Sequence, residues 1–122
     1  MEPVLEPVFD KLIKEVPGVS GVVLSTADAI CFGQRWVDGG HGEPRNQSVS
    51  AVSVIIDQVS KLQFGQMRSV VAQFQASQLV HINLAPLVLT VVGTSDLDVD
   101  LLTSTELHER LQKGFQPLRD AV

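Results

Sequence analysis

The segment 87–92 is apolar on both of its alternating faces, and Pro86 and Gly93 bound it on either side. An antiparallel strand of this kind has to be central in its sheet and covered from both sides. The chain of 122 residues must therefore supply covering elements, most simply helices, for two faces of one sheet. This requirement predicts a layered α+β fold.

Hydrophobic periodicity supplies the other elements of such a fold. Spacing of three and four residues predicts helices at 3–16, 48–64 and 103–121. Alternation of apolar and polar residues predicts further strands at 19–25, 30–37, 67–75 and 78–84, in addition to 87–94. We predict one domain, 1–122, with a five-stranded antiparallel sheet sandwiched by helices in the order α-β-β-α-β-β-β-α.

Finer expectations concern an edge strand and the last helix. The strand 67–75 has more mixed faces and suits an edge of the sheet. Residues 95–104 form a polar, acidic loop, and Thr103 followed by Glu106 resembles a capping box. Gly114 and Pro117 weaken or kink the final turns.

Composition excludes several classes of protein. The chain has 44% apolar and 19% charged residues, so intrinsic disorder is not expected. Nine basic against 14 acidic residues leave a net charge of −5 without a basic stripe, which argues against nucleic-acid binding. Part of the apolar excess is available to cover a partner.

No catalytic, cofactor-binding or metal-binding constellation is present in the sequence. The only cysteine, Cys31, is expected to be a small core residue rather than a nucleophile. His41, His81 and His108 are not at metal-ligand spacing. We therefore expect them to be surface or boundary residues rather than metal ligands. The Gly-rich stretch 39–42 lacks the dinucleotide fingerprint. We therefore predict a protein that is not an enzyme.

The sequence also argues against direct membrane insertion. Its longest apolar run covers 84–92 and includes Pro86, whereas a spanning helix needs about 20 residues. The first residues have neither the basic nor the apolar region of a signal peptide. We expect a soluble, cytoplasmic chain whose membrane association comes through a partner.

The helix expected at 48–64 is apolar over roughly 200° of its circumference, wider than the ~100° that one sheet needs. One interpretation places it between its own sheet and another helix, and the other places a partner chain on its second side. The predicted edge strand follows it directly, and an unpaired edge invites another strand. We therefore predict a dimer interface over 49–62 and 67–74. The candidate interface residues are Val49, Val52, Ile55, Ile56, Val59, Met67, Arg68, Ser69, Val70, Val71, Ala72, Gln73 and Phe74.

Several strings are similar to those of the roadblock (dynein light chain) family, in its Ragulator branch. They are DQVSKL at 57–62, SVV at 69–71, QLV at 78–80 and NLAPLVL at 83–89, with Leu107, Leu111, Phe115, Leu118 and Arg119 along the last helix. The resemblance is strongest over 57–93.

The resemblance implies a scaffold that forms a heterodimer with a second roadblock-fold subunit. It further implies a lipidated Ragulator anchor subunit, Rag GTPases and MEK/ERK kinases as partners. Recruitment to late endosomes and lysosomes for mTOR and MAPK signalling would follow through that anchor.

Two alternatives remain open. A small-molecule-sensing domain of the PAS or GAF kind would need an internal cavity lined by a few polar groups. A roadblock-type regulator of another small GTPase would need an exposed arginine that reaches a nucleotide. Arg35, Arg45 and Arg68 are the candidates by position.

Overall fold

The computed structural model describes residues 5–26, 30–37, 58–59, 61–64 and 67–121. The strands are β1 (Val19–Thr26), β2 (Cys31–Trp36), β3 (Ser69–Gln73), β4 (Gln78–Leu84) and β5 (Leu87–Gly93). The helices are α1 (Leu5–Glu15), α3 (Val99–Leu102), α4 (Thr105–Gly114) and α5 (Gln116–Ala121). Most of the helix expected at 48–64 lies outside the described residues, although Gln58 and Val59 are helical.

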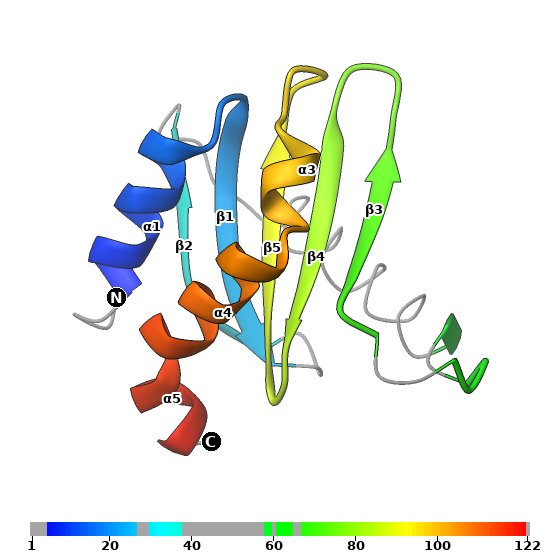
Figure 1. Cartoon of the computed structure of the whole chain (residues 1–122). Helices are drawn as coiled ribbons and strands as arrows, with labels where there is room; N and C mark the ends of the chain where they lie inside the picture. Colours follow the sequence, from blue (N-terminus) through cyan, green and yellow to red (C-terminus); the bar gives the residue numbers. More distant parts are fainter. Residues whose placement is uncertain (1–4, 27–29, 38–57, 60, 65–66, 122) are drawn as a thin grey trace.

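The five strands form one antiparallel sheet in the order β2-β1-β5-β4-β3 (Figure 1). The two-faced apolar segment becomes β5, and it occupies the centre of the sheet as expected. The mixed strand becomes β3, and it lies at an edge as expected. The predicted α+β fold with a five-stranded antiparallel sheet is confirmed.

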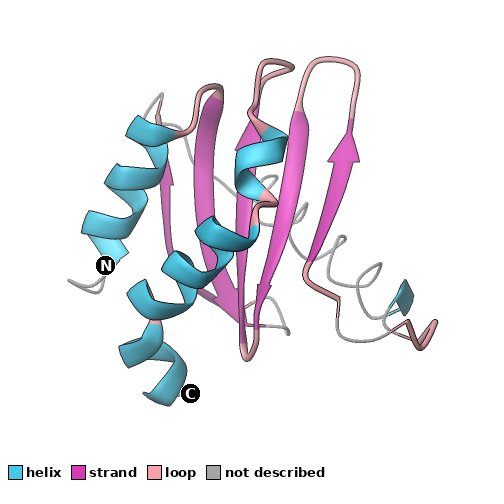
Figure 2. Cartoon of the chain, viewed as in Figure 1, coloured by secondary structure: helices cyan, strands magenta, loops and turns pink. Residues whose placement is uncertain are grey.

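The helices α1, α3, α4 and α5 all lie on one face of the sheet (Figure 2). Val80, Ile82 and Leu84 of β4 face them and alternate with Leu79 and His81, which face the other way. The helices α1, α3 and α4 contribute buried apolar side chains to the shared core, whereas α5 has no buried residue. These helical core residues are Leu5, Phe9, Leu12, Leu102, Leu107 and Leu111, with Phe115 just after α4.

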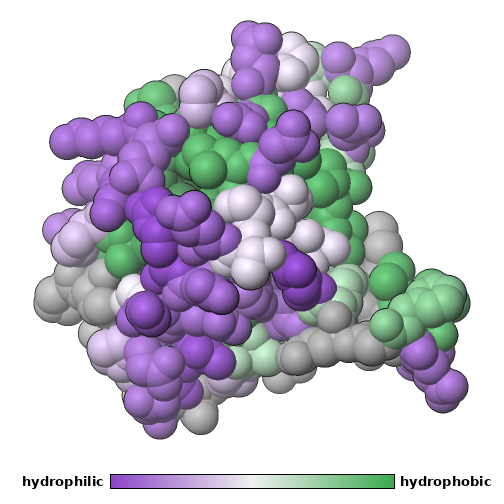
Figure 3. Space-filling model, viewed as in Figure 1, coloured by the Kyte–Doolittle hydropathy of each residue, from purple (hydrophilic) through white to green (hydrophobic). Residues whose placement is uncertain are grey.

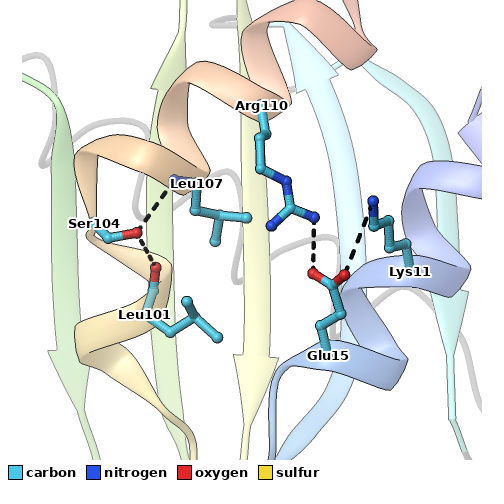
Figure 4. A network of polar contacts seen from close by, with 6 residues as sticks. All are labelled: Lys11, Glu15, Leu101, Ser104, Leu107 and Arg110. Carbon is cyan, nitrogen blue, oxygen red and sulfur yellow. Dashed lines mark hydrogen bonds and ion pairs between the residues drawn. The ribbon is translucent and has the colours of Figure 1, made fainter.

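Two aromatic rings connect α1 with the C-terminal end of α4 over this core. The rings of Phe9 and Phe115 meet edge to face, with centroids 6.2 Å apart. At the surface, Arg110 Nη2 donates to Glu15 Oε2 at 2.8 Å, and Lys11 Nζ lies 3.9 Å from Glu15 Oε1 (Figure 4). These contacts hold α1 beside α4 across the front of the sheet.

The C-terminal region differs from the single helix predicted at 103–121. It consists of α3, α4 and α5, and α3 lies inside the segment expected to be a loop. The cap of α4 is Ser104 rather than Thr103, because the Ser104 hydroxyl accepts from Leu107 N at 3.2 Å (Figure 4). The expected weakening of the final turns is confirmed, since α4 ends at Gly114 and Pro117 lies in the first turn of α5.

On the opposite face of the sheet, Trp36 packs over Gly21. The two residues are partners in the β1–β2 register. A Cβ at Gly21 would come within 2.0 Å of the indole ring. Glycine is therefore required for the close approach of the ring to the strand.

Candidate protein-interaction surface

The strand β3 has a neighbour on one side only. It pairs with β4 from Ser69 opposite Ile82 to Gln73 opposite Gln78, and no described strand pairs with its other side. Its outward N–H and C=O groups are the kind of edge that accepts another strand. The five residues of β3 are half-buried or exposed, unlike the buried residues of β4.

The candidate residues of β3 divide between the two faces of the sheet. Val70 and Ala72 pair with His81 and Leu79, so their side chains belong to the face opposite the described helices. Val71 pairs with Val80 on the helix side and is 38% exposed. Apolar side chains therefore flank the open edge on both faces.

Phe74 follows β3 and is 62% exposed. Its backbone N donates to Ser77 O at 2.8 Å, which closes the turn into β4. The candidates at the start of the strand are Met67, half-buried, and Arg68, exposed. Val49, Val52, Ile55 and Ile56 lie outside the described residues.

A second group of exposed apolar side chains precedes the edge strand. Val59 is partly exposed, Leu62 is 58% exposed and Phe64 is 91% exposed. Hydrophobic atoms are visible at the lower right of Figure 3, where Figure 1 places the segment 58–64. We use the name apolar patch for the exposed apolar residues before, in and just after β3, which are Val59, Leu62, Phe64, Val71 and Phe74.

Phe64 was not among the sequence candidates. The predicted helix 48–64 ends at Phe64, but the predicted interface 49–62 stops two residues earlier; the signal that could have identified Phe64 is an aromatic residue at the end of the apolar series. Gln63 just before it has φ +62°, so the backbone turns there and the side chain of Phe64 leaves the helical series.

Two expectations about reactive residues are wrong. Cys31 is exposed, and it is the first residue of the edge strand β2. Partial desolvation nevertheless raises the pKa of its thiol, which disfavours the nucleophilic thiolate.

His81 is fully buried rather than superficial. It lies on β4, where the face opposite the helices is also covered, and Thr90 Oγ1 on β5 hydrogen-bonds its Nδ1 at 2.8 Å. Burial lowers the pKa of His81 to about 4, so the ring is neutral at pH 7. The expectation for His108 agrees with its half-buried position on α4.

The described residues contain no group of three His, Cys, Asp or Glu that could hold a metal ion. None of the described helices is long and apolar enough to cross a membrane. Among the arginine candidates, Arg35 forms an ion pair with Asp10, and Arg68 donates to Thr105 Oγ1 at 2.9 Å. Arg45 lies outside the described residues.

Comparison with solved structures identifies the fold. A Roadblock/LC7 domain from Streptomyces avermitilis has a TM-score of 0.75 at 18% identity, with 93% of this chain and 96% of that one covered. The gliding protein MglB from Thermus thermophilus has a TM-score of 0.75 at 12% identity, with 100% and 95% covered. The class is therefore a roadblock fold.

Comparison of sequences identifies the family. The model described as "Mitogen-activated protein kinase kinase 1 interacting" matches residues 4–122, and the chain belongs to this family. The Ragulator complex protein LAMTOR3 of Homo sapiens is 28% identical over 115 residues, which cover 91% of each chain. LAMTOR3-B of Xenopus laevis is 33% identical over 78 residues, 64% of this chain and 62% of that protein. The resemblance to a roadblock-family Ragulator subunit is confirmed.

Proposed function

We propose that this chain is a non-enzymatic scaffold subunit that works as half of a roadblock heterodimer. The observation that carries the proposal is the open edge of β3 beside the apolar patch. In this proposal residues 1–122 act as one domain, and the interface comprises 49–62 and 67–74.

Hydrogen bonding along the edge supports the proposed geometry. A second roadblock-fold subunit that aligns its own edge strand with β3 would satisfy the outward backbone groups of both strands. The two sheets would then form one continuous sheet across the dimer. The register would be fixed by the side chains that alternate along β3.

The apolar patch supports the same partner. Exposed Leu and Phe side chains are costly to leave in water, and such side chains often belong to interaction sites. Burial of apolar area contributes roughly 25 cal/mol per Å². Phe64 and Phe74 are the largest exposed side chains of the patch, so they are the expected anchors.

Family membership supports the wider assembly. Relatives named Ragulator complex protein LAMTOR3 indicate a place in a Ragulator-like complex. The family description indicates binding to MAP kinase kinase 1. In this proposal a lipidated anchor subunit brings the dimer to late endosomes and lysosomes, where it recruits Rag GTPases and MAP kinase pathway components for mTOR and MAPK signalling.

The experiment compares Val71→Glu and Phe74→Glu with the unchanged chain. Each change places a carboxylate in the proposed interface, where desolvation should weaken partner binding by about 2 kcal/mol, roughly thirtyfold in Kd. A pull-down first identifies the roadblock-fold partner, and native mass spectrometry and isothermal titration calorimetry then measure the complex. Circular dichroism checks that the variants fold.

Val37→Glu is the matched control. Val37 is 58% exposed after β2, at the opposite edge of the sheet, so this change should leave Kd unchanged. A chain that stays monomeric at micromolar concentration with and without roadblock-fold proteins would refute the proposal. Unfolding of Val71→Glu alone would assign that position to the core instead.

A further inference from the structure

A polar pocket of about 160 Å³ lies where the start of β3, the end of β4 and the helices α4 and α5 meet. Arg68 enters it from the start of β3, His108 and Gln112 from α4, and Arg119 from α5. Asn83 at the end of β4 also lines it. The proposed function above assigns no role to this pocket.

Asn83 forms hydrogen bonds to three of the other residues that line the pocket. Its side-chain Nδ2 donates to Met67 O at 2.7 Å, and its Oδ1 accepts from Ala85 N at 3.0 Å. Its backbone oxygen lies 2.9 Å from His108 Nε2, and a carbonyl oxygen only accepts, so His108 donates. The pocket is therefore held in shape by hydrogen bonds within the chain.

The two arginines of the pocket contact only neutral acceptors among the described residues. Arg68 donates to Thr105 Oγ1, and Arg119 donates through Nε and Nη2 to Ala85 O at 3.3 and 3.2 Å and through Nη1 to Gln116. A guanidinium carries five N–H groups, so both arginines have donors left. The Gln112 side-chain amide makes no hydrogen bond to any described residue.

This arrangement contrasts with the other arginines of the described chain. Arg35 and Arg110 are each neutralised by a carboxylate, Asp10 and Glu15 respectively. In a chain of net charge −5, two guanidinium groups that have no carboxylate partner among the described residues leave a local positive charge in one pocket. Charge-assisted hydrogen bonds make such a pocket suited to an anion.

The geometry favours a phosphate group over a planar carboxylate. The donors approach from β3, α4 and α5, and a phosphate monoester offers three acceptor oxygens in a tetrahedral arrangement and nearly two negative charges. An anionic membrane is a poorer fit. Exposed Glu106, Glu109 and Asp120 lie on the same two helices, and they would be repelled by a charged bilayer surface.

We propose that the pocket formed by Arg68, His108, Gln112 and Arg119 binds a phosphorylated side chain of a partner protein. Arg68 belongs to both the pocket and the predicted interface, whereas His108, Gln112 and Arg119 lie outside that interface. A phosphorylated segment could therefore dock onto the assembled dimer, and phosphorylation of the partner would control its binding.

The test titrates the full-length chain, with its roadblock partner if one is required, with three peptides of one sequence. They carry phosphoserine, serine or glutamate at the central position. Fluorescence anisotropy should give saturable binding of the phosphoserine peptide alone. Arg119→Gln should weaken that binding about tenfold or more. Arg119→Lys should weaken it less, because lysine keeps the positive charge but lacks the planar guanidinium that can donate two parallel hydrogen bonds.

Arg110→Gln is the matched control, because it removes an exposed arginine of α4 that is already paired with Glu15. It should bind the phosphoserine peptide as the unchanged chain does. Equal binding of all three peptides, or equal weakening by Arg110→Gln and Arg119→Gln, would overturn the proposal. So would Arg119-dependent cosedimentation with phosphatidylserine vesicles in the absence of peptide binding.

Thermal unfolding and native mass spectrometry of Arg119→Gln keep the result interpretable. A folded, dimeric Arg119→Gln that loses the phosphoserine peptide supports the pocket. If that variant unfolds, His108→Gln and Gln112→Ala replace it, and unchanged peptide binding in both would overturn the proposal. The two proposals are distinguished by Arg119 and Val71, because Arg119 lies outside the predicted interface and Val71 does not line the pocket. Loss of dimerisation in a Val71→Glu variant that still binds the phosphoserine peptide would contradict only the proposed dimer, and loss of the peptide in a dimeric Arg119→Gln would support only the pocket.

Discussion

At the scale of the residue, His81 shows how burial changes the chemistry of a side chain. Alternation along 78–84 already placed His81 on the same face as Leu79. Tertiary packing then covered that face, and Thr90 supplied a hydrogen-bond partner across the β4–β5 pair. A buried imidazole with one neutral partner remains uncharged, since protonation would leave a cation without water around it.

The stability of the chain should fall between pH 6.5 and pH 4 because of His81. Its pKa is about 4 in the folded chain and 6.5 as its ordinary value, so in this window the unfolded chain binds a proton that the folded chain does not. The loss should approach about 3 kcal/mol at the acid end. Urea unfolding at a series of pH values measures it.

His81→Gln should flatten that pH dependence, because glutamine does not titrate. His108→Gln is the control for the substitution itself, because it replaces the other described histidine with the same residue. An unchanged pH profile in His81→Gln would contradict the assignment of the effect to this residue.

At the scale of the element, the last third of the chain shows the limits of periodicity. Leu107 and Leu111 fall on one face of α4, as the spacing predicted. The break at Gly114 was also visible in the sequence. The residue at which α4 begins was not visible in the sequence. Thr103 and Ser104 are both acceptable N-caps, and the choice between them depends on where α3 ends.

Ser104→Ala should lower the free energy of unfolding by about 1 kcal/mol, since it removes the acceptor for Leu107 N. Thr103→Ala should cost less. The Thr103 hydroxyl bonds back to Val99 O at 2.9 Å at the end of α3 and caps nothing in α4. Chemical denaturation of both variants measures the difference, and a larger loss in Thr103→Ala would contradict the cap assignment.

At the scale of the whole molecule, one face of the sheet carries the helices α1, α3, α4 and α5, and no described strand pairs with the outer edge of β3. The opposite edge, β2, carries an ion pair from Arg35 to Asp10 of α1, which ties that edge to the chain's own helix. The two edges are therefore not equivalent. The apolar patch lies on the β3 side, which is why assembly is proposed there.

If the complex is the stable form, its melting temperature should depend on concentration. A tenfold increase in the concentration of chain and partner in equal amounts should raise Tm by a few degrees, because association stabilises the folded subunits by mass action. Differential scanning calorimetry at two concentrations tests this expectation. Val71→Glu should remove the dependence, and a concentration-independent Tm for the unchanged complex would contradict it.

The sequence by itself determined the layered fold. The two-faced strand 87–92 required a central position, and the mixed strand 67–75 suited an edge, because side-chain alternation reports directly which faces of a strand are covered. Most strand boundaries agree with the expectations to within a few residues. The resemblance over 57–93 also identified the family correctly.

Only the tertiary structure decided which polar residues share a site. His81 and Thr90 met across two strands, and Arg68, Asn83, His108 and Arg119 met in one pocket although up to 51 positions separate them in the sequence. Periodicity gives the face of an element and not its neighbours. The burial of His81 and the meeting of Arg68 and Arg119 in one pocket depend on those neighbours. The neighbours are determined only when the elements pack together.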